Sequence, residues 1–209
     1  MKKGAMFGLD ARIALAIFGA LSVISGAALY SSIQESKKIR MAASLEEVKK
    51  ALTQYILDTG SYMIPETSTS TNMRIGDLFE NYTNVTGWSG PYIGVDSTLV
   101  VNLELTIAAD KKIDRLWNAS RHSDVSWGST DYTVTTLKPC TTKNCMIYLR
   151  KSLPNTSSSY SNLIHIYTLL DEYYDNNDGA GLGKVRARTA GTTFYIYLEL
   201  MPEYTKLNS

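Results

Sequence analysis

The sequence predicts an α+β protein in which a long N-terminal α-helix packs on a small antiparallel β-sheet domain. An uncharged apolar segment at 13–30 continues directly into an amphipathic segment, and together they predict one helix over 9–58. From residue 59 the composition shifts to Ser, Thr, Asn, Tyr and Gly, with short alternating runs typical of half-buried strands. We therefore expect a globular domain over 59–209.

The segment 13–30 has the composition of a transmembrane helix. At about 1.5 Å per residue it is just long enough to cross a hydrocarbon core of about 30 Å. Lys2, Lys3 and Arg12 precede it, which favours a cytoplasmic N-terminus and export of the remaining chain. A Sec signal peptide cut after Ala28 and a plain uncleaved anchor are two alternative interpretations of this segment.

The second half of the expected helix has one apolar face. Leu45, Val48 and Leu52 recur at spacings of three and four, while acidic and basic residues occupy the opposite face. Gly60 can adopt the left-handed conformation that closes a helix. The helix is therefore expected to end near Asp58.

Short periodic runs predict the elements of the globular domain. These are a short helix at 73–82, strands at 99–107, 131–137, 145–150 and 193–200, and a second helix at 162–174. The segment 110–120 fits either a helical turn or an irregular connection. Lys184, Arg186 and Arg188 alternate along one further strand, and we expect a solvated strand face there rather than a basic binding patch.

A basic leader ending in Gly8, an apolar helix, an amphipathic stem and a small domain together resemble the type IV pilin and type II secretion pseudopilin superfamily. The segments 52–65 and 87–94 resemble the family's stem end and its W-G-PY loop, and 169–186 resembles its helix, D-G turn and strand. The resemblance implies a pilin-like fold and a leader peptide at 1–8. A prepilin peptidase would cut after Gly8, leaving Leu9 as the N-methylated first residue.

The resemblance also implies a function and a location. The chain would be a non-enzymatic subunit of a type IV pilus-like or pseudopilus filament, homo- or hetero-oligomeric. Adhesion, motility, secretion and DNA uptake all stay open as the role of that filament. It would begin as a single-pass protein of the bacterial inner membrane with a periplasmic C-terminal domain. Its partners would be the prepilin peptidase, an inner-membrane platform and an assembly ATPase. The alternative is a membrane-anchored or secreted, adhesin-like binding domain that never polymerises.

One position departs from the family pattern. Ile13 stands at the fifth mature position, where the family has a Glu that neutralises a neighbouring N-terminal amine. Asp10 is the nearby carboxylate that can replace it, since an apolar environment strengthens such a pair; alternatively, Asp10 and Arg12 are interfacial charges flanking the span. Gly19 and Gly26 would let neighbouring helices approach closely, or simply reflect transmembrane composition.

Charge and motifs argue against two other classes of protein. The formal net charge is +1, so the surface lacks the overall excess of Lys and Arg that holds a nucleic acid. We therefore do not expect a nucleic-acid partner. The run 121–124 contains Arg, His, Ser and Asp, but catalytic triads are built from positions that converge in space, not from neighbours. We expect His122 in a polar loop and His165 as a packed or edge residue of a helix, so the sequence predicts no enzyme.

The two cysteines predict a local disulfide. Cys140 and Cys145 would both meet an oxidising compartment in an exported domain, and the short ring between them can be closed. A loop this short removes little unfolded-state entropy, so the bond would mainly hold a turn before the strand at 145–150.

The acidic turn after the second helix is a candidate calcium site. Oxygen-bearing side chains suit Ca²⁺, and the major pseudopilins that this chain resembles carry calcium near this end of the domain. The spacing is not that of an EF-hand, and a plain helix-ending turn is the alternative. The candidate ligands are Asp171, Asp175, Asn177 and Asp178.

Overall fold

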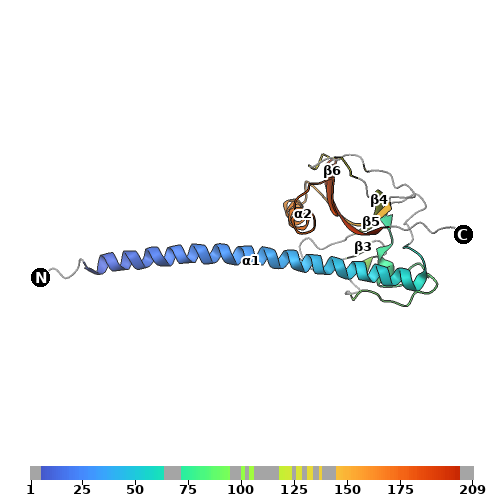
Figure 1. The fold of residues 1–209 in the computed structure, drawn as a ribbon, viewed down its shortest axis with the longest axis horizontal. Helices are drawn as coiled ribbons and strands as arrows, with labels where there is room; N and C mark the ends of the chain where they lie inside the picture. The colour runs from blue at the N-terminus through green and yellow to red at the C-terminus, as the bar shows by residue number, and fades with distance from the viewer. Residues whose placement is uncertain are drawn as a thin grey trace. The chain divides into compact units, whose positions relative to one another are not determined.

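The protein is described by a computed structural model covering residues 6–63, 72–94, 100–101, 104–105, 118–123, 126–128, 131–133, 137 and 145–202. The chain divides into two compact units, Met1–Ile39 and Arg40–Ser209. One helix, α1 (Met6–Thr59), belongs to both (Figure 1).

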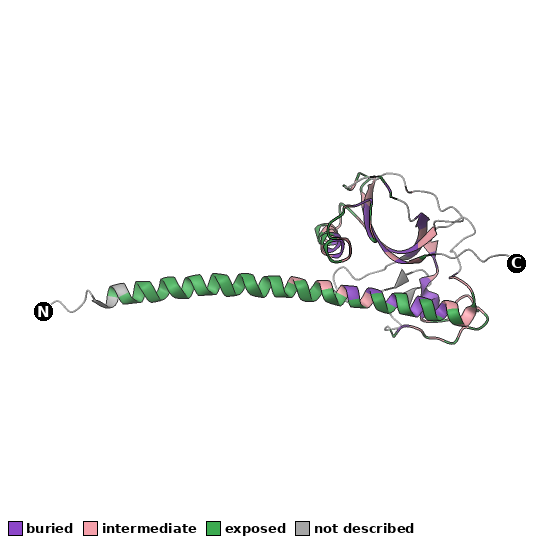
Figure 2. Ribbon diagram, in the orientation of Figure 1, coloured by how far each residue is buried: buried purple, intermediate pink, exposed green. Residues whose placement is uncertain are grey.

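The part of α1 in the first unit exposes its apolar side chains, and Figure 2 shows most of it in the colour of exposed residues. Its most apolar window has a mean hydropathy of 2.1, and none of that window is buried within the chain. This is the helix that is long and apolar enough to cross a membrane. The predicted span at 13–30 therefore lies in one helix whose apolar side chains are exposed in the described part of the chain.

The part of α1 in the second unit buries one face. Leu45, Val48 and Leu52 are buried, as their spacing predicts, whereas the charged residues between them are exposed. The helix ends at Thr59, where Gly60 adopts a φ of 64° and donates its backbone N–H to the carbonyl of Ile56 at 2.9 Å. The predicted end of the helix is confirmed to within one residue.

An antiparallel five-stranded sheet forms the centre of the second unit, in the order β1-β4-β5-β7-β6. Its strands are β1 (Asn72–Met73), β4 (Asn118–Ser123), β5 (Cys145–Pro154), β6 (Val185–Ala190) and β7 (Thr193–Pro202). The other elements are a short 3₁₀ helix η1 (Ile75–Leu78), a second helix α2 (Tyr160–Asp175) and a separate pair, β2 (Val100–Val101) with β3 (Glu104–Leu105).

Helices α1 and α2 contribute to one hydrophobic core with alternate residues of the sheet. The buried face of α1 and the apolar face of α2 meet side chains such as Ile147, Leu149 and Ile196. The predicted α+β class is thus confirmed: a long N-terminal helix packed on an antiparallel sheet.

The glycine-rich loop after η1 closes against the end of α1. Gly87 has a φ of 84°, and a Cβ there would lie 2.5 Å from the carbonyl oxygen of Asp58. The indole of Trp88 donates to the carbonyl of Asp77 at 2.7 Å, and the rings of Tyr55 and Tyr92 meet edge to face. These contacts fix the last turns of α1 to the domain.

Several predicted elements differ from the observed ones. Residues 131–133 form a turn rather than a strand, and the strand predicted at 99–107 contains two short strands, β2 and β3, that pair with each other. The helix predicted at 73–82 is reduced to η1, and β4 begins inside the segment left ambiguous. Alternation of apolar residues indicates an extended chain but does not show where the chain reverses.

The edge strand β6 is covered by loops. The backbone N–H of Ala187 donates to Ala180 at 2.9 Å, and that of Thr189 donates to Tyr132 at 2.9 Å. The N–H of Val185 donates to the Asp175 carboxylate at 2.7 Å. These amides are therefore not available for pairing with a strand from another chain.

Candidate functional site

The residues predicted to act in processing and assembly lie on the first unit. Gly8, Asp10 and Arg12 are exposed, and the space around the Cα atoms of Gly8, Gly19 and Gly26 is open. The side chain of Leu9 is outside the described residues. Nothing in this geometry tests cleavage after Gly8 or a filament contact, so both stay predictions.

The predicted disulfide falls partly outside the described chain. Cys145 is the first residue of β5, whereas Cys140 lies in a segment that the structure does not describe. The pairing stays a prediction.

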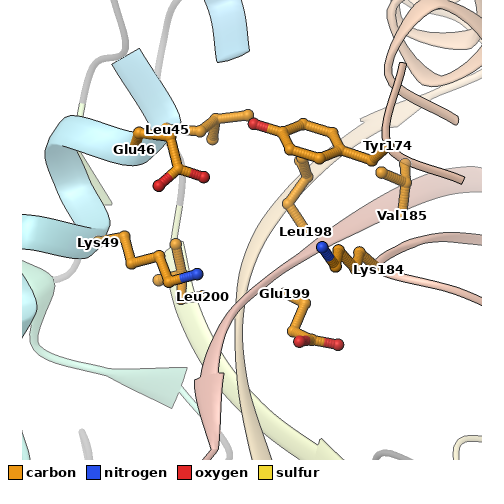
Figure 3. Close-up of a pocket in the computed structure, with 9 residues that line it drawn as sticks. All are labelled: Leu45, Glu46, Lys49, Tyr174, Lys184, Val185, Leu198, Glu199 and Leu200. Atoms are coloured by element: carbon orange, nitrogen blue, oxygen red, sulfur yellow. The ribbon is translucent and has the colours of Figure 1, made fainter. Parts of the chain in front are cut away.

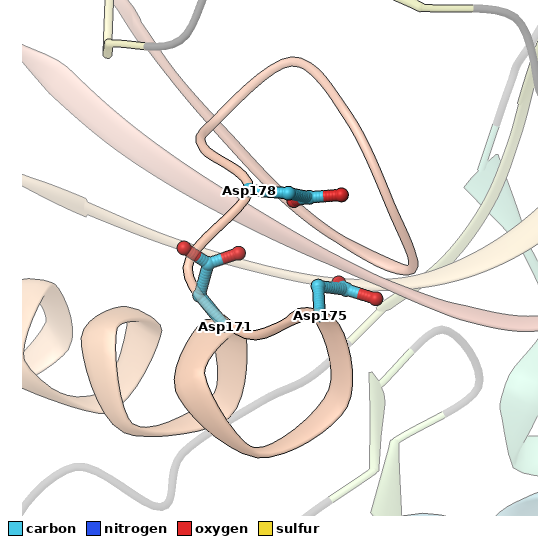
Figure 4. Close-up of side chains that lie close together, drawn as sticks. All are labelled: Asp171, Asp175 and Asp178. Atoms are coloured by element: carbon cyan, nitrogen blue, oxygen red, sulfur yellow. The ribbon is translucent and has the colours of Figure 1, made fainter.

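The end of α2 positions the candidate metal ligands. Asn176 and Asn177 adopt left-handed conformations, with φ of 53° and 61°, and both donate their backbone N–H to the carbonyl of Asp171. This cap turns the chain back over the last turn of the helix. As a result, three of the four predicted ligands, Asp171, Asp175 and Asp178, come together (Figure 4).

The three carboxylates are close enough to share one cation. One oxygen from each lies within 4.8 Å of the others. Asp175 Oδ2 accepts the backbone N–H of Lys184 at 2.8 Å and that of Val185 at 2.7 Å, which holds its carboxylate in place. Gly183 lies against the cluster, since a Cβ there would be 2.5 Å from Asp175 Cγ and 2.8 Å from Asp178 Oδ2.

Asp171 is the unusual member of the cluster. Its side chain is buried, with 4% of the residue exposed. Tyr167 donates its hydroxyl to Asp171 Oδ2 at 3.1 Å, but Oδ1 is buried without a hydrogen-bond partner among the described residues. A buried carboxylate oxygen without a partner costs free energy. A cation held by the cluster would satisfy it.

Burial and repulsion from neighbouring carboxylates disfavour the charged forms of Asp171 and Asp178. Burial raises the pKa of Asp171 most, and the charges of Asp178 and Asp175 raise it further. The Tyr167 hydroxyl and the Gly179 backbone N–H, which both donate towards the carboxylate, oppose this rise. Burial also raises the pKa of Asp178, and the charge of Asp175 adds to it against the effect of Arg186. A divalent cation would remove both costs.

The donor chemistry fits Ca²⁺ in part. Carboxylate oxygens are its preferred ligands, and it takes six to eight oxygens. The cluster supplies three carboxyl groups, so backbone carbonyls or water would have to complete the shell. Asn177, the fourth predicted ligand, is exposed, and it donates its backbone N–H to the carbonyl of Asp171 at 3.3 Å.

A small cavity lies between the second-unit part of α1 and strands β6 and β7 (Figure 3). Its volume is about 40 Å³, enough for a few water molecules. Its lining combines apolar and charged side chains: Leu45, Glu46, Lys49, Tyr174, Lys184, Val185, Leu198, Glu199 and Leu200. Burial raises the pKa of Glu199, and the nearby Arg186, Lys184 and Lys49 oppose this. The cavity is too small for an organic substrate.

Two expectations about single side chains were wrong. His122 lies on β4 rather than in a loop, with 4% of the residue exposed, among the rings of Trp127, Tyr148 and Tyr197. Arg186 is likewise 4% exposed, so its part of β6 is not a solvated strand face. The polar run at 118–123 carries no apolar alternation, and no sequence signal marks His122 as buried.

Comparison of the chain with family models, with curated proteins and with solved structures finds no match in any of the three. The function must therefore be argued from the geometry of the chain.

Proposed function

We propose that this chain is a structural subunit of a type IV pilus-like or type II secretion pseudopilus filament in a bacterial envelope. The observation that carries the proposal is α1: none of its most apolar window is buried among the described residues, and the same helix continues into the core of a globular domain. Leu15, Phe18 and Leu21, for example, are all exposed.

Water is an unfavourable environment for such a surface. Exposed apolar area costs about 25 cal/mol per Å², so lipid or other helices must cover the segment. In the inner membrane lipid covers it, and in a filament the same segments of neighbouring subunits do. Moving the apolar segment from lipid into the filament changes its hydrophobic free energy little, because both surroundings are apolar. Close packing of helices and pairing of polar groups therefore decide whether the filament assembles. This is the role proposed for Gly19, Gly26 and Asp10.

Processing of the N-terminus tests the proposal first. The full chain is expressed in a bacterium that contains a prepilin peptidase, and its intact mass and N-terminal sequence are measured. We expect a start at N-methylated Leu9 for the wild type and for the control Gly4→Val. We expect the uncut chain for Gly8→Val.

The other outcomes have distinct meanings. A start at Leu29 means signal-peptidase cleavage and a secreted domain, which overturns the filament proposal. An intact Met1 in the wild type means a fixed anchor, and the adhesin-like binding module then replaces the filament subunit.

Assembly is tested separately, on the processed protein. Sheared surface filaments are collected by ultracentrifugation and probed for the chain. Asp10→Asn should lower recovery at least tenfold if Asp10 pairs with a neighbouring amine, because an unpaired charge in an apolar filament core is costly. Arg12→Gln is the control. Equal losses in both variants would show that the two residues act only as interfacial charges.

We further propose a structural calcium site at Asp171, Asp175 and Asp178. Among the residues that the structure describes, the buried Oδ1 of Asp171 has no hydrogen-bond partner, and this distinguishes the cluster from an ordinary helix-ending turn. Calcium at about 100 times its Kd would stabilise the fold by about 2.7 kcal/mol. The full chain in detergent should therefore melt at higher temperature in calcium than in a chelator.

Two variants separate the calcium site from a general salt effect. Asp178→Asn should lose the calcium-dependent shift in Tm, whereas Glu172→Gln, at an exposed position on the same helix, should keep it. An identical Tm for the wild type in calcium and in chelator would leave the helix-ending turn as the explanation.

A further inference from the structure

The face of the sheet opposite the core carries arginines beside tyrosines. Strand β7 places Tyr195 and Tyr197 on this face, and the cross-strand register brings Arg150 of β5 and Arg186 of β6 to Tyr197. Arg188 of β6 lies opposite Tyr195. We call these five residues the arginine–tyrosine face.

Ring contacts orient the guanidinium groups. Those of Arg188 and Arg150 lie 4.7 Å and 5.9 Å from the centroid of the same Tyr195 ring. Arg188 also donates Nε–H to the hydroxyl of Tyr197 at 3.1 Å. Stacking and hydrogen bonding of this kind hold a guanidinium in a defined position and reduce the entropy lost when it binds an anion.

Arg186 is the buried arginine of this face. It is buried over the rings of Trp127 and Tyr148, at 5.1 Å and 5.6 Å, and donates Nη1–H to the carbonyl of Ser123 at 3.3 Å. Its charge acts on Asp178 and Glu199. Arg186 is therefore a positioning residue, and Arg150 and Arg188, which are half-buried, present the accessible charge.

The charges of Arg150 and Arg188 act on the same neighbouring side chains. Within the described part of the chain no carboxylate pairs with Arg150. Burial, followed by the charges of Arg150 and Arg188, lowers the pKa of His122. Burial raises the pKa of Tyr197, and the charges of the same two arginines oppose this. The net charge of the whole chain is near zero and does not reveal that three arginines lie on this one face of the sheet.

We propose that the arginine–tyrosine face binds a phosphodiester polymer through its backbone phosphates, with Arg150 and Arg188 as the contacts. Guanidinium groups match the geometry of phosphate oxygens and form charge-assisted hydrogen bonds with them. Two such groups held near one ring give a polymer two neighbouring points of attachment.

The same geometry argues against recognition of bases. Stacking of a base needs an accessible aromatic face. The ring of Tyr195 already meets the guanidinium groups of Arg150 and Arg188, and Tyr197 stacks beside it with an interplanar angle of 19°. The polymer is therefore held by its charge and not read by sequence, as in non-specific phosphate binding.

The test measures binding by fluorescence anisotropy, with the full chain in non-ionic detergent. The probes are a labelled single-stranded oligothymidylate and an abasic strand of the same length. We expect equal affinity for both. Arg150→Gln should weaken binding about tenfold, the size of one charge-assisted hydrogen bond. The slope of log K against log salt should fall by about 0.7 for each arginine removed.

Control variants separate a binding role from a structural one. Arg150→Lys keeps the charge but loses the stacked guanidinium, so it should keep the salt slope and weaken binding less than Arg150→Gln does. Lys50→Gln removes a charge from exposed helix surface and should have no effect. Unfolding curves of each variant identify any loss of binding that is due to misfolding. Arg188→Gln tests the second proposed phosphate contact.

Three results would overturn the proposal. Unchanged affinity in both arginine variants would remove the site. A clear preference for the base-bearing strand over the abasic strand would show base recognition instead of backbone binding. Tighter binding of heparin than of either strand would indicate a sulfated glycan as the ligand.

Discussion

The two halves of α1 are both helical but are stabilised by different surroundings. In residues 13–30 the apolar side chains surround the helix and none of the most apolar window is buried. In the second unit only one face is apolar, and it is buried against the sheet and α2. The comparison shows that α1 packs into the core of the domain only where its apolar residues are confined to one face. The uniformly apolar half requires an environment outside the chain.

The largest effect we expect concerns pH and is confined to the packed unit. Burial, followed by the charges of Arg150 and Arg188, lowers the pKa of His122 to about 3 from its usual value of 6.5. Between these values the unfolded chain binds a proton that the folded chain does not. The contribution of His122 to the free energy of unfolding is therefore fully present above pH 6.5. It is lost as the pH falls towards 3 and amounts to on the order of 4 kcal/mol.

Denaturant unfolding from pH 7 to pH 4 measures this loss. Carboxyl groups with raised pKa, such as Asp77 and Asp171, act in the opposite direction, because their contribution is greatest at low pH. The variant His122→Gln keeps those groups and removes the histidine. Its stability should fall less than that of the wild type, and parallel pH profiles would contradict the prediction.

A matched pair of leucine substitutions compares the two halves of α1 directly. Leu52 is 0% exposed in the core, whereas Leu21 is 58% exposed. Leu52→Ala should lower the free energy of unfolding by about 3 kcal/mol, through lost burial and a cavity. Leu21→Ala should change it by less than about 0.5 kcal/mol. Denaturant titration in detergent gives both values, and equal effects would mean that the first half also packs within the chain.

The smallest effect tests how the packed half of α1 ends. Gly87→Ala places a Cβ against the carbonyl of Asp58 at a positive φ, so we expect a loss of about 2 kcal/mol. Gly94 has open space around its Cα and no such φ, and Gly94→Ala should be nearly neutral. Thermal unfolding of the two variants measures the difference. A similar Tm for both would show that the loop at 85–92 can move away from the helix.

Local patterns predicted the elements that lie along one continuous segment. Spacings of three and four gave α2 to within two residues and the buried face of α1, and alternation gave the cores of β5 and β7. Such periodicities follow from the geometry of a single helix or strand. They failed for β4, whose polar side chains are buried by residues far away in the sequence.

The candidate sites were predictable to different degrees. The acidic turn was found because its ligands lie within eight residues, so one helix cap brings three of them together. The arginine–tyrosine face was missed because its residues come from β5, β6 and β7, and only the strand register places them side by side.

The sequence by itself determined where α1 changes from uniformly apolar to amphipathic and where it stops at Gly60, because neighbouring residues encode both. The tertiary structure alone decided that Asp171 Oδ1 is buried without a hydrogen-bond partner in the described part of the chain. It alone also decided that His122 lies among aromatic rings and that Arg150 and Arg188 share the ring of Tyr195. Burial and electrostatic environment depend on contacts between distant segments, and only the packed sheet and helices establish those contacts.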